Sequence, residues 1–247
     1  MNWRKRCPTR KFNCCILAIS SVDASTNAAT KRSINGQVGL VVLTGIMALV
    51  SCWDAPFPAE LKLQHIPTVV ILLLMTWSTF ACRFSMASFV CVAVFLWLHI
   101  VGARWIYSFV PYDDWSQSVS GSSLSQRFDW RRNHYDRLVH FASGILIAVP
   151  AAECLQRWGG MRPLGAAIVS IAIVVAIGAV YEILEWQIAT FFAPAVAEAY
   201  NGQQGDVWDP QKDMALAWFG ATISAGLLFR YRFESAAGGS VVDSVTD

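Results

Sequence analysis

Apolar runs long enough to cross a bilayer dominate this chain and limit the folds open to it. A membrane-spanning helix needs about 20 predominantly apolar residues. Of the 247 residues, 55% are hydrophobic and only 15% are charged, whereas a soluble domain carries about 25% charge. Because a backbone inside lipid must satisfy its own hydrogen bonds, these runs predict an all-α, polytopic transmembrane bundle. About six helices are expected, over residues 36–53, 66–83, 86–104, 137–155, 164–188 and 213–230.

The predicted transmembrane domain covers residues 34–231 and lies between two polar ends. Residues 1–33 are rich in Lys and Arg and contain one acidic residue, Asp23. The short apolar patch CCILAI is a poor core for a secretory signal, so we expect a basic, disordered N-terminal tail. A disordered C-terminal tail is expected over residues 232–247.

Positive charge is distributed unevenly between the two sets of connecting segments. If the N-terminus lies inside, the cytoplasmic side receives most of the 19 Lys and Arg residues, which is the arrangement that the positive-inside rule favours. We therefore predict that both termini are cytoplasmic and that the lipid bilayer is the main partner. The net charge of +2 is too small to indicate binding to nucleic acid. The seven cysteines contain no CxxC pair, so a disulfide or zinc–thiolate framework is not expected.

Ionisable residues gather at the ends of the last three predicted helices. NHYDRLVHFASG opens the fourth helix, YEILEW closes the fifth and GDVWDPQKDM leads into the sixth. In an alternating topology these three ends lie at one membrane surface, whichever way the chain is inserted. With the predicted orientation this surface is the outer one. We expect a single polar pocket there, formed by one imidazole and six carboxylates: His140, Asp136, Glu182, Glu185, Asp206, Asp209 and Asp213.

Small residues follow these polar groups at helical spacing. Gly144 and Ala148 lie below His140, Gly178 lies one turn below Glu182, and Gly220 lies below Asp213. Because small side chains let membrane helices approach closely, this pattern predicts tight packing among the last three helices.

Several of the polar residues also have a purely structural interpretation. Asp209 followed by Pro210 is typical of a helix start, with an N-capping carboxylate and proline at the first position. Asp136 could pair with a nearby arginine, and His140 could be a hydrogen-bond partner in the core. The arginines within reach in the sequence are Arg131, Arg132 and Arg137.

Glu182 and Glu185 are harder to explain by structure alone. Carboxylates in the last turns of an apolar helix are unfavourable because of desolvation and because of the helix dipole. An arginine, shared protons or a metal ion should therefore face them.

The third predicted helix carries two further candidates, His99 and Arg104. His99 could belong to the same cavity or could hydrogen-bond to a neighbouring helix, and the sequence leaves both open. The connection over residues 105–135 contains the Ser-rich segment SQSVSGSSLSQ, which we expect to be flexible. An interfacial lid is predicted from Asp113, Asp114, Trp115 and Trp130.

The series LHIVGARWIYSFVP, NHYDRLVHFASG, YEILEW and GDVWDPQKDM resembles the YjdF-like family of bacterial inner-membrane proteins, over roughly residues 37–230. The resemblance implies a multi-pass protein of the inner membrane and implies no reaction. The long basic N-terminus, the Ser-rich connection and Arg104 depart from the family pattern.

A looser likeness links the chain to VanZ-like membrane proteins, which are associated with glycopeptide resistance. It rests on the order of Asp136, His140 and Phe141, a late glutamate, and an Asp-led final helix that contains Gly220.

The polar pocket favours a metal-dependent enzyme that acts on a lipid or cell-envelope precursor. Carboxylates and imidazole are ligands for a divalent ion, and no P-loop, GxSxG, GxGxxG or HExxH pattern supports another familiar chemistry. The predicted metal ligands are His140, Glu182, Glu185 and Asp213, with Asp136 and Asp209 as orienting or acid–base groups. The predicted substrate-binding residues are Arg131, Arg132, Arg137 and Asp206.

Two other functions remain open. The pocket could be a buried salt-bridge network in a non-catalytic scaffold, or it could bind ions in a cation- or proton-coupled transporter. The sequence does not give the substrate, the identity of a cofactor or the oligomeric state.

Overall fold

The computed structural model describes residues 24–81, 84–191, 200 and 202–242. These residues form helices and connecting loops, which confirms the all-α prediction. In chain order the helices are α2 (Ala24–Ser51), α3 (Pro58–Ala81), α4 (Met86–Arg104), α5 (Tyr112–Ser120), α6 (Leu124–Phe128), α7 (Tyr135–Arg157), α8 (Pro163–Phe191) and α10 (Asp209–Val242).

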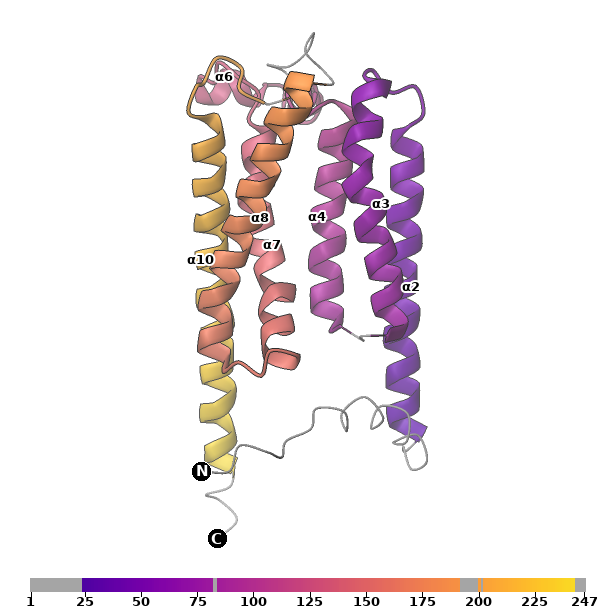
Figure 1. Ribbon diagram of the computed structural model, residues 1–247, viewed down its shortest axis with the longest axis vertical. Coiled ribbons are helices and arrows are strands. Elements are labelled where there is room, and N and C mark those ends of the chain that lie inside the picture. The colour runs from indigo at the N-terminus through magenta and orange to yellow at the C-terminus, as the bar shows by residue number, and fades with distance from the viewer. Residues whose placement is uncertain (1–23, 82–83, 192–199, 201, 243–247) are drawn as a thin grey trace, which may run out of the picture.

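The long helices run side by side, and the short helices α5 and α6 lie at one end of the bundle (Figure 1). Five helices are long and apolar enough to cross a membrane: α2, α3, α4, α7 and α8. The sixth predicted span lies in α10, which packs along α7 and α8 and is not among the five spans found in the described part of the chain. Its apolar run is bounded by Asp213 and Arg230 and contains several small and polar residues. A polytopic helical bundle is therefore confirmed, with five spans that satisfy both length and composition.

The outermost helices extend beyond the predicted spans. Residues 24–33, placed in the predicted basic tail, form the first turns of α2, and α10 continues to Val242. The rest of both predicted tails, 1–23 and 243–247, lies outside the described residues. The start of α2 and the end of α10 lie at the same end of the bundle (Figure 1). Which side of the membrane this end faces stays a prediction.

The long helices form two groups of three. Helices α2, α3 and α4 pack together, as do α7, α8 and α10, and the main contact between the groups is the pair α4 and α7. Glu153 of α7 links the two groups by hydrogen bonds to the start of α4, at the end of the bundle opposite the short helices. Its carboxylate accepts hydrogen bonds from the Ser85 N–H (2.9 Å) and the Ser88 hydroxyl (2.5 Å) at the start of α4. A carboxylate at a helix N-terminus is favoured by the helix dipole.

Helices α7 and α10 approach closely at glycines, as the small-residue pattern predicts. A Cβ atom added to Gly144 would collide with the α10 backbone at Ala217 and Ala221, and one added to Gly220 would collide with the carbonyl oxygen of Phe141. Helix α8 also packs against α7 and α10, but not through Gly178, because no neighbouring atom lies within 4 Å of a Cβ built there. Gly178 instead lines a cavity.

The Ser-rich connection, expected to be flexible, forms the two short helices α5 and α6. Its hydroxyl groups bond the local backbone, as serine side chains often do. The Ser116 hydroxyl donates to the Ser122 carbonyl at 2.9 Å, and Gly121 ends α5 in the left-handed conformation with φ 73°. Of the residues predicted to form a lid, Trp115 packs edge-on against Trp105 with ring centroids 5.7 Å apart.

A Gly144→Ala substitution should destabilise the bundle, because the added methyl group would have to displace the backbone of α10. Overpacking of this kind costs about 1–3 kcal/mol. Thermal unfolding of the purified protein in detergent measures the effect. Gly39→Ala on α2 is the matched control, because nothing lies within 4 Å of its Cβ position and alanine has the higher helix propensity. Equal melting temperatures for the two variants would contradict the close approach of α7 and α10.

Candidate functional site

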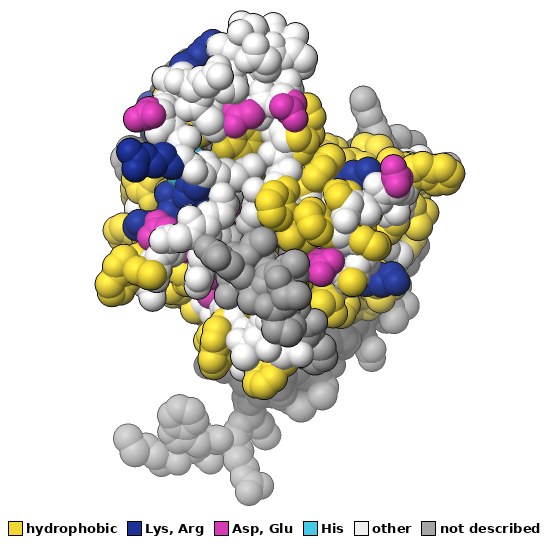
Figure 2. All heavy atoms as spheres, turned by 90° about the horizontal axis from the view of Figure 1, so that it is seen from above, with side chains coloured by type: hydrophobic (Ala, Val, Ile, Leu, Met, Phe, Trp, Pro, Cys, Tyr) yellow, Lys and Arg dark blue, Asp and Glu magenta, His cyan; other side chains and the backbone are white. Residues whose placement is uncertain are grey.

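The predicted polar pocket lies where α7 and α10 begin and α8 ends, at the end of the bundle that carries α5 and α6 (Figure 1). Figure 2 looks onto this end and shows Lys and Arg side chains next to Asp and Glu side chains. The polar residues form two layers. The surface layer consists of Arg132, Arg137, Asp206, Asp209 and Lys212. The inner layer consists of Asp136, His140, Glu182, Glu185 and Asp213.

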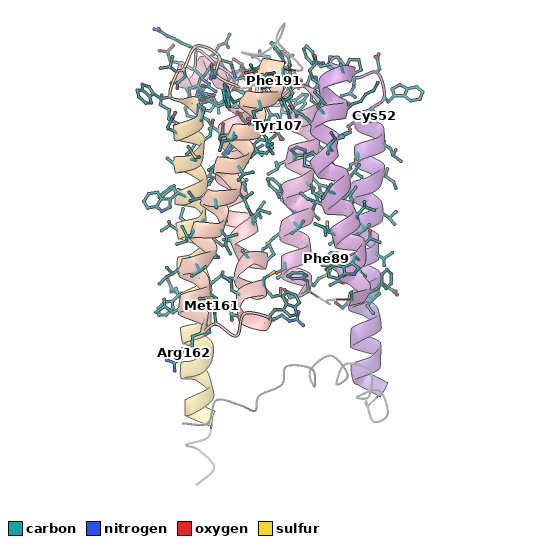
Figure 3. The ribbon with its side chains drawn as sticks, viewed as in Figure 1. Cys52, Phe89, Tyr107, Met161, Arg162 and Phe191 are labelled. Carbon is teal, nitrogen blue, oxygen red and sulfur yellow. The ribbon has the colours of Figure 1, made fainter. Side chains whose placement is uncertain are left out.

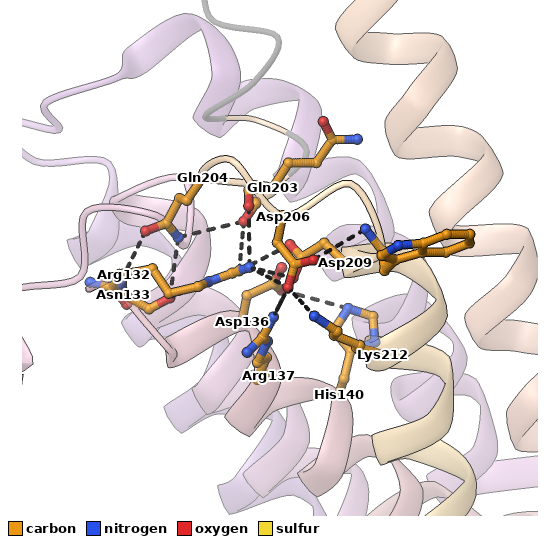
Figure 4. Close-up of polar contacts among 12 residues, drawn as sticks. Arg132, Asn133, Asp136, Arg137, His140, Gln203, Gln204, Asp206, Asp209 and Lys212 are labelled. Carbon is orange, nitrogen blue, oxygen red and sulfur yellow. Dashed lines mark hydrogen bonds and ion pairs between the residues drawn. The ribbon is translucent and has the colours of Figure 1, made fainter. Parts of the chain in front are cut away.

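Ion pairs link all five charged side chains of the surface layer (Figure 4). Arg132 forms a bidentate pair with the buried Asp209, with Nη1–Oδ1 at 2.5 Å and Nη2–Oδ2 at 2.9 Å. Nη2 of Arg137 bonds Asp206 Oδ2 at 2.6 Å and Asp209 Oδ1 at 3.0 Å. Lys212 Nζ bonds the same oxygen of Asp206 at 2.5 Å. Both arginines are therefore already occupied by carboxylates.

The loop before α10 is built around Arg132. This side chain donates to the carbonyl oxygens of Gly202 (2.7 Å) and Gln203 (3.2 Å). Gln204 accepts from the Asn133 N–H at 2.8 Å and donates to the Asn133 carbonyl at 3.2 Å. Gly202 has φ 70°, and a Cβ atom there would collide with the Asp136 carboxylate. The loop therefore holds the start of α7 and the start of α10 in one fixed arrangement.

The predicted N-capping role of Asp209 is not observed. Helix α10 begins at Asp209, but its carboxylate bonds Arg132 and Arg137 instead of a helix N–H. Asp206 supports the turn before the helix, with Oδ1 accepting from the Trp208 N–H at 3.2 Å. The hydrogen bond from Lys212, together with those from the Trp208 N–H and Arg137, lowers the pKa of Asp206 to about 2.

The inner layer contains carboxylates and one imidazole. His140 Nε2 lies 3.3 Å from Glu182 Oε1 and 3.6 Å from Asp136 Oδ1. Asp136, His140 and Asp213 each offer one ligand atom, and these three atoms lie within 4.8 Å of one another. The side chains of Asp136 and Asp213 are deeply buried, since the two residues are 5% and 2% exposed.

Charge in the inner layer is not balanced by arginine or lysine. Among the described residues, no arginine or lysine forms an ion pair with these carboxylates, and Glu182 Oε1 and Asp213 Oδ1 have no hydrogen-bond partner. Buried carboxylates without a partner are strongly unfavourable. The inner layer therefore requires bound protons or a cation.

The arginine pairing considered for Asp136 is not observed, and Arg131 and Glu185 lie apart from the three grouped ligand atoms. Asp136 forms no ion pair with the arginines named as its partners, because Arg132 and Arg137 bind Asp206 and Asp209 instead. Arg131 is exposed and forms no ion pair within the described part of the chain. Glu185 is buried on α8 but lies outside the group of three ligand atoms. It lines a hollow of about 340 Å³ together with Glu182, Gln203, Pro210 and Met214.

Arg104 has a structural role away from the two layers. It donates to the carbonyl oxygens of Ser51 (2.7 Å) and Trp53 (2.8 Å) at the end of α2. These bonds satisfy carbonyl groups that a helix C-terminus leaves without intrahelical partners.

His99 both hydrogen-bonds to a neighbouring helix and lines a cavity, the two possibilities that the sequence left open. Its Nε2 lies 3.0 Å from the Gln64 carbonyl oxygen of α3, and its Nδ1 lies 2.5 Å from the Tyr107 hydroxyl. Since a carbonyl only accepts, Nε2 carries the proton and Nδ1 accepts from Tyr107. His99 also lines the cavity that contains Gly178.

This central cavity has a volume of about 200 Å³ and lies against the inner layer, with Asp136 and His140 in its wall. Sequence reasoning missed two of its polar residues, Tyr107 and Tyr181. Both occur within motifs that were recognised, since Tyr181 directly precedes Glu182 in YEILEW and Tyr107 lies in GARWIYSFVP. A buried tyrosine usually has a hydrogen-bond partner, which is the property that could have identified them.

Comparisons with known proteins agree with the resemblance seen in the motifs. The family described as "Predicted membrane protein (DUF2238)" matches residues 37–234. The chain is 32% identical over 174 residues to the inner membrane protein YjdF of Escherichia coli, covering 68% of this chain and 78% of that protein. No solved structure matches the chain. The looser likeness to VanZ-like proteins stays a prediction.

Asp209→Asn should destabilise the protein strongly, because it removes the charge opposite Arg132 and Arg137 in a buried position. Breaking a buried ion pair costs about 3–5 kcal/mol. Lys212→Gln is the control, since Lys212 is half exposed (51%) in its pair with Asp206 and a surface pair contributes about 0–1 kcal/mol. Chemical unfolding of both variants in detergent compares the two losses. Similar losses would show that the surface layer does not depend on Asp209.

Proposed function

The chain belongs to the DUF2238 family of membrane proteins, and we propose that it is a metal-dependent enzyme acting on a lipid or cell-envelope precursor. The protein is a multi-pass protein of the bacterial inner membrane. The observation that supports the enzyme proposal most is the inner layer. It is a set of buried carboxylates around one imidazole, with no arginine or lysine pairing them among the described residues.

The side chains of the inner layer fit a divalent cation. Asp136, His140 and Asp213 offer ligand atoms within 4.8 Å of one another, and oxygen and imidazole donors suit magnesium, manganese or zinc. Oδ1 of Asp213 is buried and has no hydrogen-bond partner, which is expected of an oxygen that binds an ion. Three protein ligands would leave coordination positions for a substrate. Asp136 is thus better placed as a ligand than as an acid–base group.

The other residues have distinct roles in this proposal. A divalent ion held in the inner layer would polarise a phosphoryl or carbonyl oxygen of the substrate. Glu182, with Oε1 unbonded and 3.3 Å from His140 Nε2, is placed to accept a proton from an attacking water. Arg132 and Arg137 act as positioning residues, because Asp206 and Asp209 occupy their guanidinium groups.

The scaffold alternative is supported by the surface layer alone. Arg132, Arg137 and their aspartates form a complete ion-pair network, which suffices to fix the helix ends. It does not explain why further carboxylates are buried below it without cations.

The transporter alternative needs a polar path across the membrane. Below His140 the central cavity is lined mainly by apolar side chains, among them Ile147, Val174 and Ile71. An apolar lining is unfavourable for an ion or a proton relay, so the geometry favours a site that faces one end only.

Purified protein should bind on the order of one divalent ion per chain after metal removal and reloading with Mn²⁺ or Zn²⁺. His140→Ala and Asp213→Asn should each lower the bound metal to background, because each removes one of the three grouped ligands. Elemental mass spectrometry of the desalted protein gives the stoichiometry. Asp114→Asn is the matched control, since Asp114 is an exposed carboxylate in α5, at the same end of the bundle.

Wild-type protein that binds no divalent ion, while His140→Ala and Asp213→Asn remain folded, would rule out the metal-dependent enzyme. Loss of folding in Asp213→Asn and in Glu182→Gln, without metal in the wild type, would favour the scaffold.

A further inference from the structure

We propose that the central cavity binds one hydrocarbon chain of an amphiphile whose anionic headgroup lies at the inner layer. The position of the headgroup rests on the proposed metal centre. The position of the hydrocarbon chain rests on the cavity itself, on its lining and on where it opens.

Polarity along the cavity falls in the same direction on three helices. On α7 the lining residues are Asp136 and His140, then Ser143, then Ile147. On α8 Tyr181 is followed one turn deeper by Gly178 and then by Val174. On α4 His99 is followed by Phe95. One end of the cavity is therefore polar and the other is hydrocarbon, which matches the two parts of an amphiphile.

The cavity is open space and not a packed seam. No neighbouring atom lies within 4 Å of a Cβ built on Gly178, so there is free space beside this glycine at the middle of the cavity. Apolar cavities exclude water and bind apolar ligands. The volume of about 200 Å³ is smaller than the roughly 300–1,000 Å³ of a pocket for a drug-sized ligand. The cavity volume suits a segment of one hydrocarbon chain. A lipid with two hydrocarbon chains would have to keep the second one outside the cavity.

The cavity opens sideways to the apolar exterior of the bundle. Helices α3 and α8 are not among the packed helix pairs, yet Ile71 of α3 and Ile177 of α8 line the same cavity. Ile177 is also 54% exposed, so the cavity reaches the lipid-facing surface there. A chain could enter from the bilayer without leaving hydrocarbon, as burial of apolar surface favours.

The polar end of the cavity also contains a neutral tyrosine beside the inner layer. Tyr107 lies near the same end of the bundle as Phe191 (Figure 3), and its hydroxyl donates to His99 Nδ1. Burial raises the pKa of Tyr107 well above its usual value, so the hydroxyl stays protonated. With Asp136 and His140 in the same wall, an anionic headgroup would be held through a cation and not through arginine.

A photoreactive dodecyl phosphate, with its diazirine near the chain end, tests the proposal on full-length protein in phosphatidylcholine nanodiscs. Peptide mapping after irradiation should find the label on α7 and α8 near Ile147 and Val174, which line the apolar end. Gly178→Leu should reduce this labelling about ten-fold, because its side chain fills the cavity. Gly45→Leu on α2 is the control, since its Cβ position is also free of neighbours and Gly45 does not line the cavity.

The outcomes separate this inference from the proposed function. Undiminished labelling in a folded Gly178→Leu protein, or labelling confined to lipid-facing residues such as Leu73, would overturn the cavity proposal even if the protein binds metal. Cavity labelling that survives removal of divalent ions would support the chain position and count against the metal-held headgroup. If Gly178→Leu does not fold, Gly178→Val provides the same test with a smaller side chain.

Discussion

The buried ion pair between Arg132 and Asp209 is the interaction on which the rest of the site depends. It joins the segment before α7 to the first residue of α10, and Arg132 extends the link to the carbonyl groups of Gly202 and Gln203. A bidentate arginine–carboxylate pair fixes orientation as well as distance. Asp213 lies one turn after Asp209 on α10 and so faces Asp136 and His140 of α7.

One motif, GDVWDPQKDM, thus contributes carboxylates to both layers. Those in the surface layer are paired with basic side chains, and the one in the inner layer is not. Asp206 and Asp209 form ion pairs with arginine and lysine, and these pairs stabilise the helix ends without leaving either carboxylate unpaired. Asp213, only one turn deeper, has an oxygen with no partner. Asp209 and Asp213 are both buried, so the two aspartates differ in their partners and not in their exposure. A buried carboxylate without a partner is strongly unfavourable. The inner layer is therefore the part of the motif that a structural role does not explain.

Much of this arrangement could be predicted from the sequence, because it follows from local patterns. The apolar runs gave the spans, alternation placed three helix ends at one surface, and the glycines indicated the contact of α7 with α10. The pairing of charges could not be predicted. Arg132 forms its ion pair with Asp209 and not with Asp136, which is nearer in the sequence. The loop containing Gly202 brings the start of α10 against Arg132, and this tertiary contact cannot be seen in a local pattern. Gly178 followed the same small-residue pattern as Gly144 but lines a cavity, since the two helix groups meet mainly through α4 and α7.

This incomplete packing between the groups is also what gives the site its position. Had α8 packed against α3 as closely as α7 packs against α10, the space beside Gly178 would be filled and the inner layer would be sealed in the core. Instead, the polar end of the cavity lies next to Asp136 and His140, and its apolar end opens near Ile177. Polar atoms of an amphiphile lie at the membrane surface and its chain lies in hydrocarbon. A reactive centre at the junction of a polar layer and a lipid-facing cavity can reach such a molecule without removing either part from its preferred surroundings.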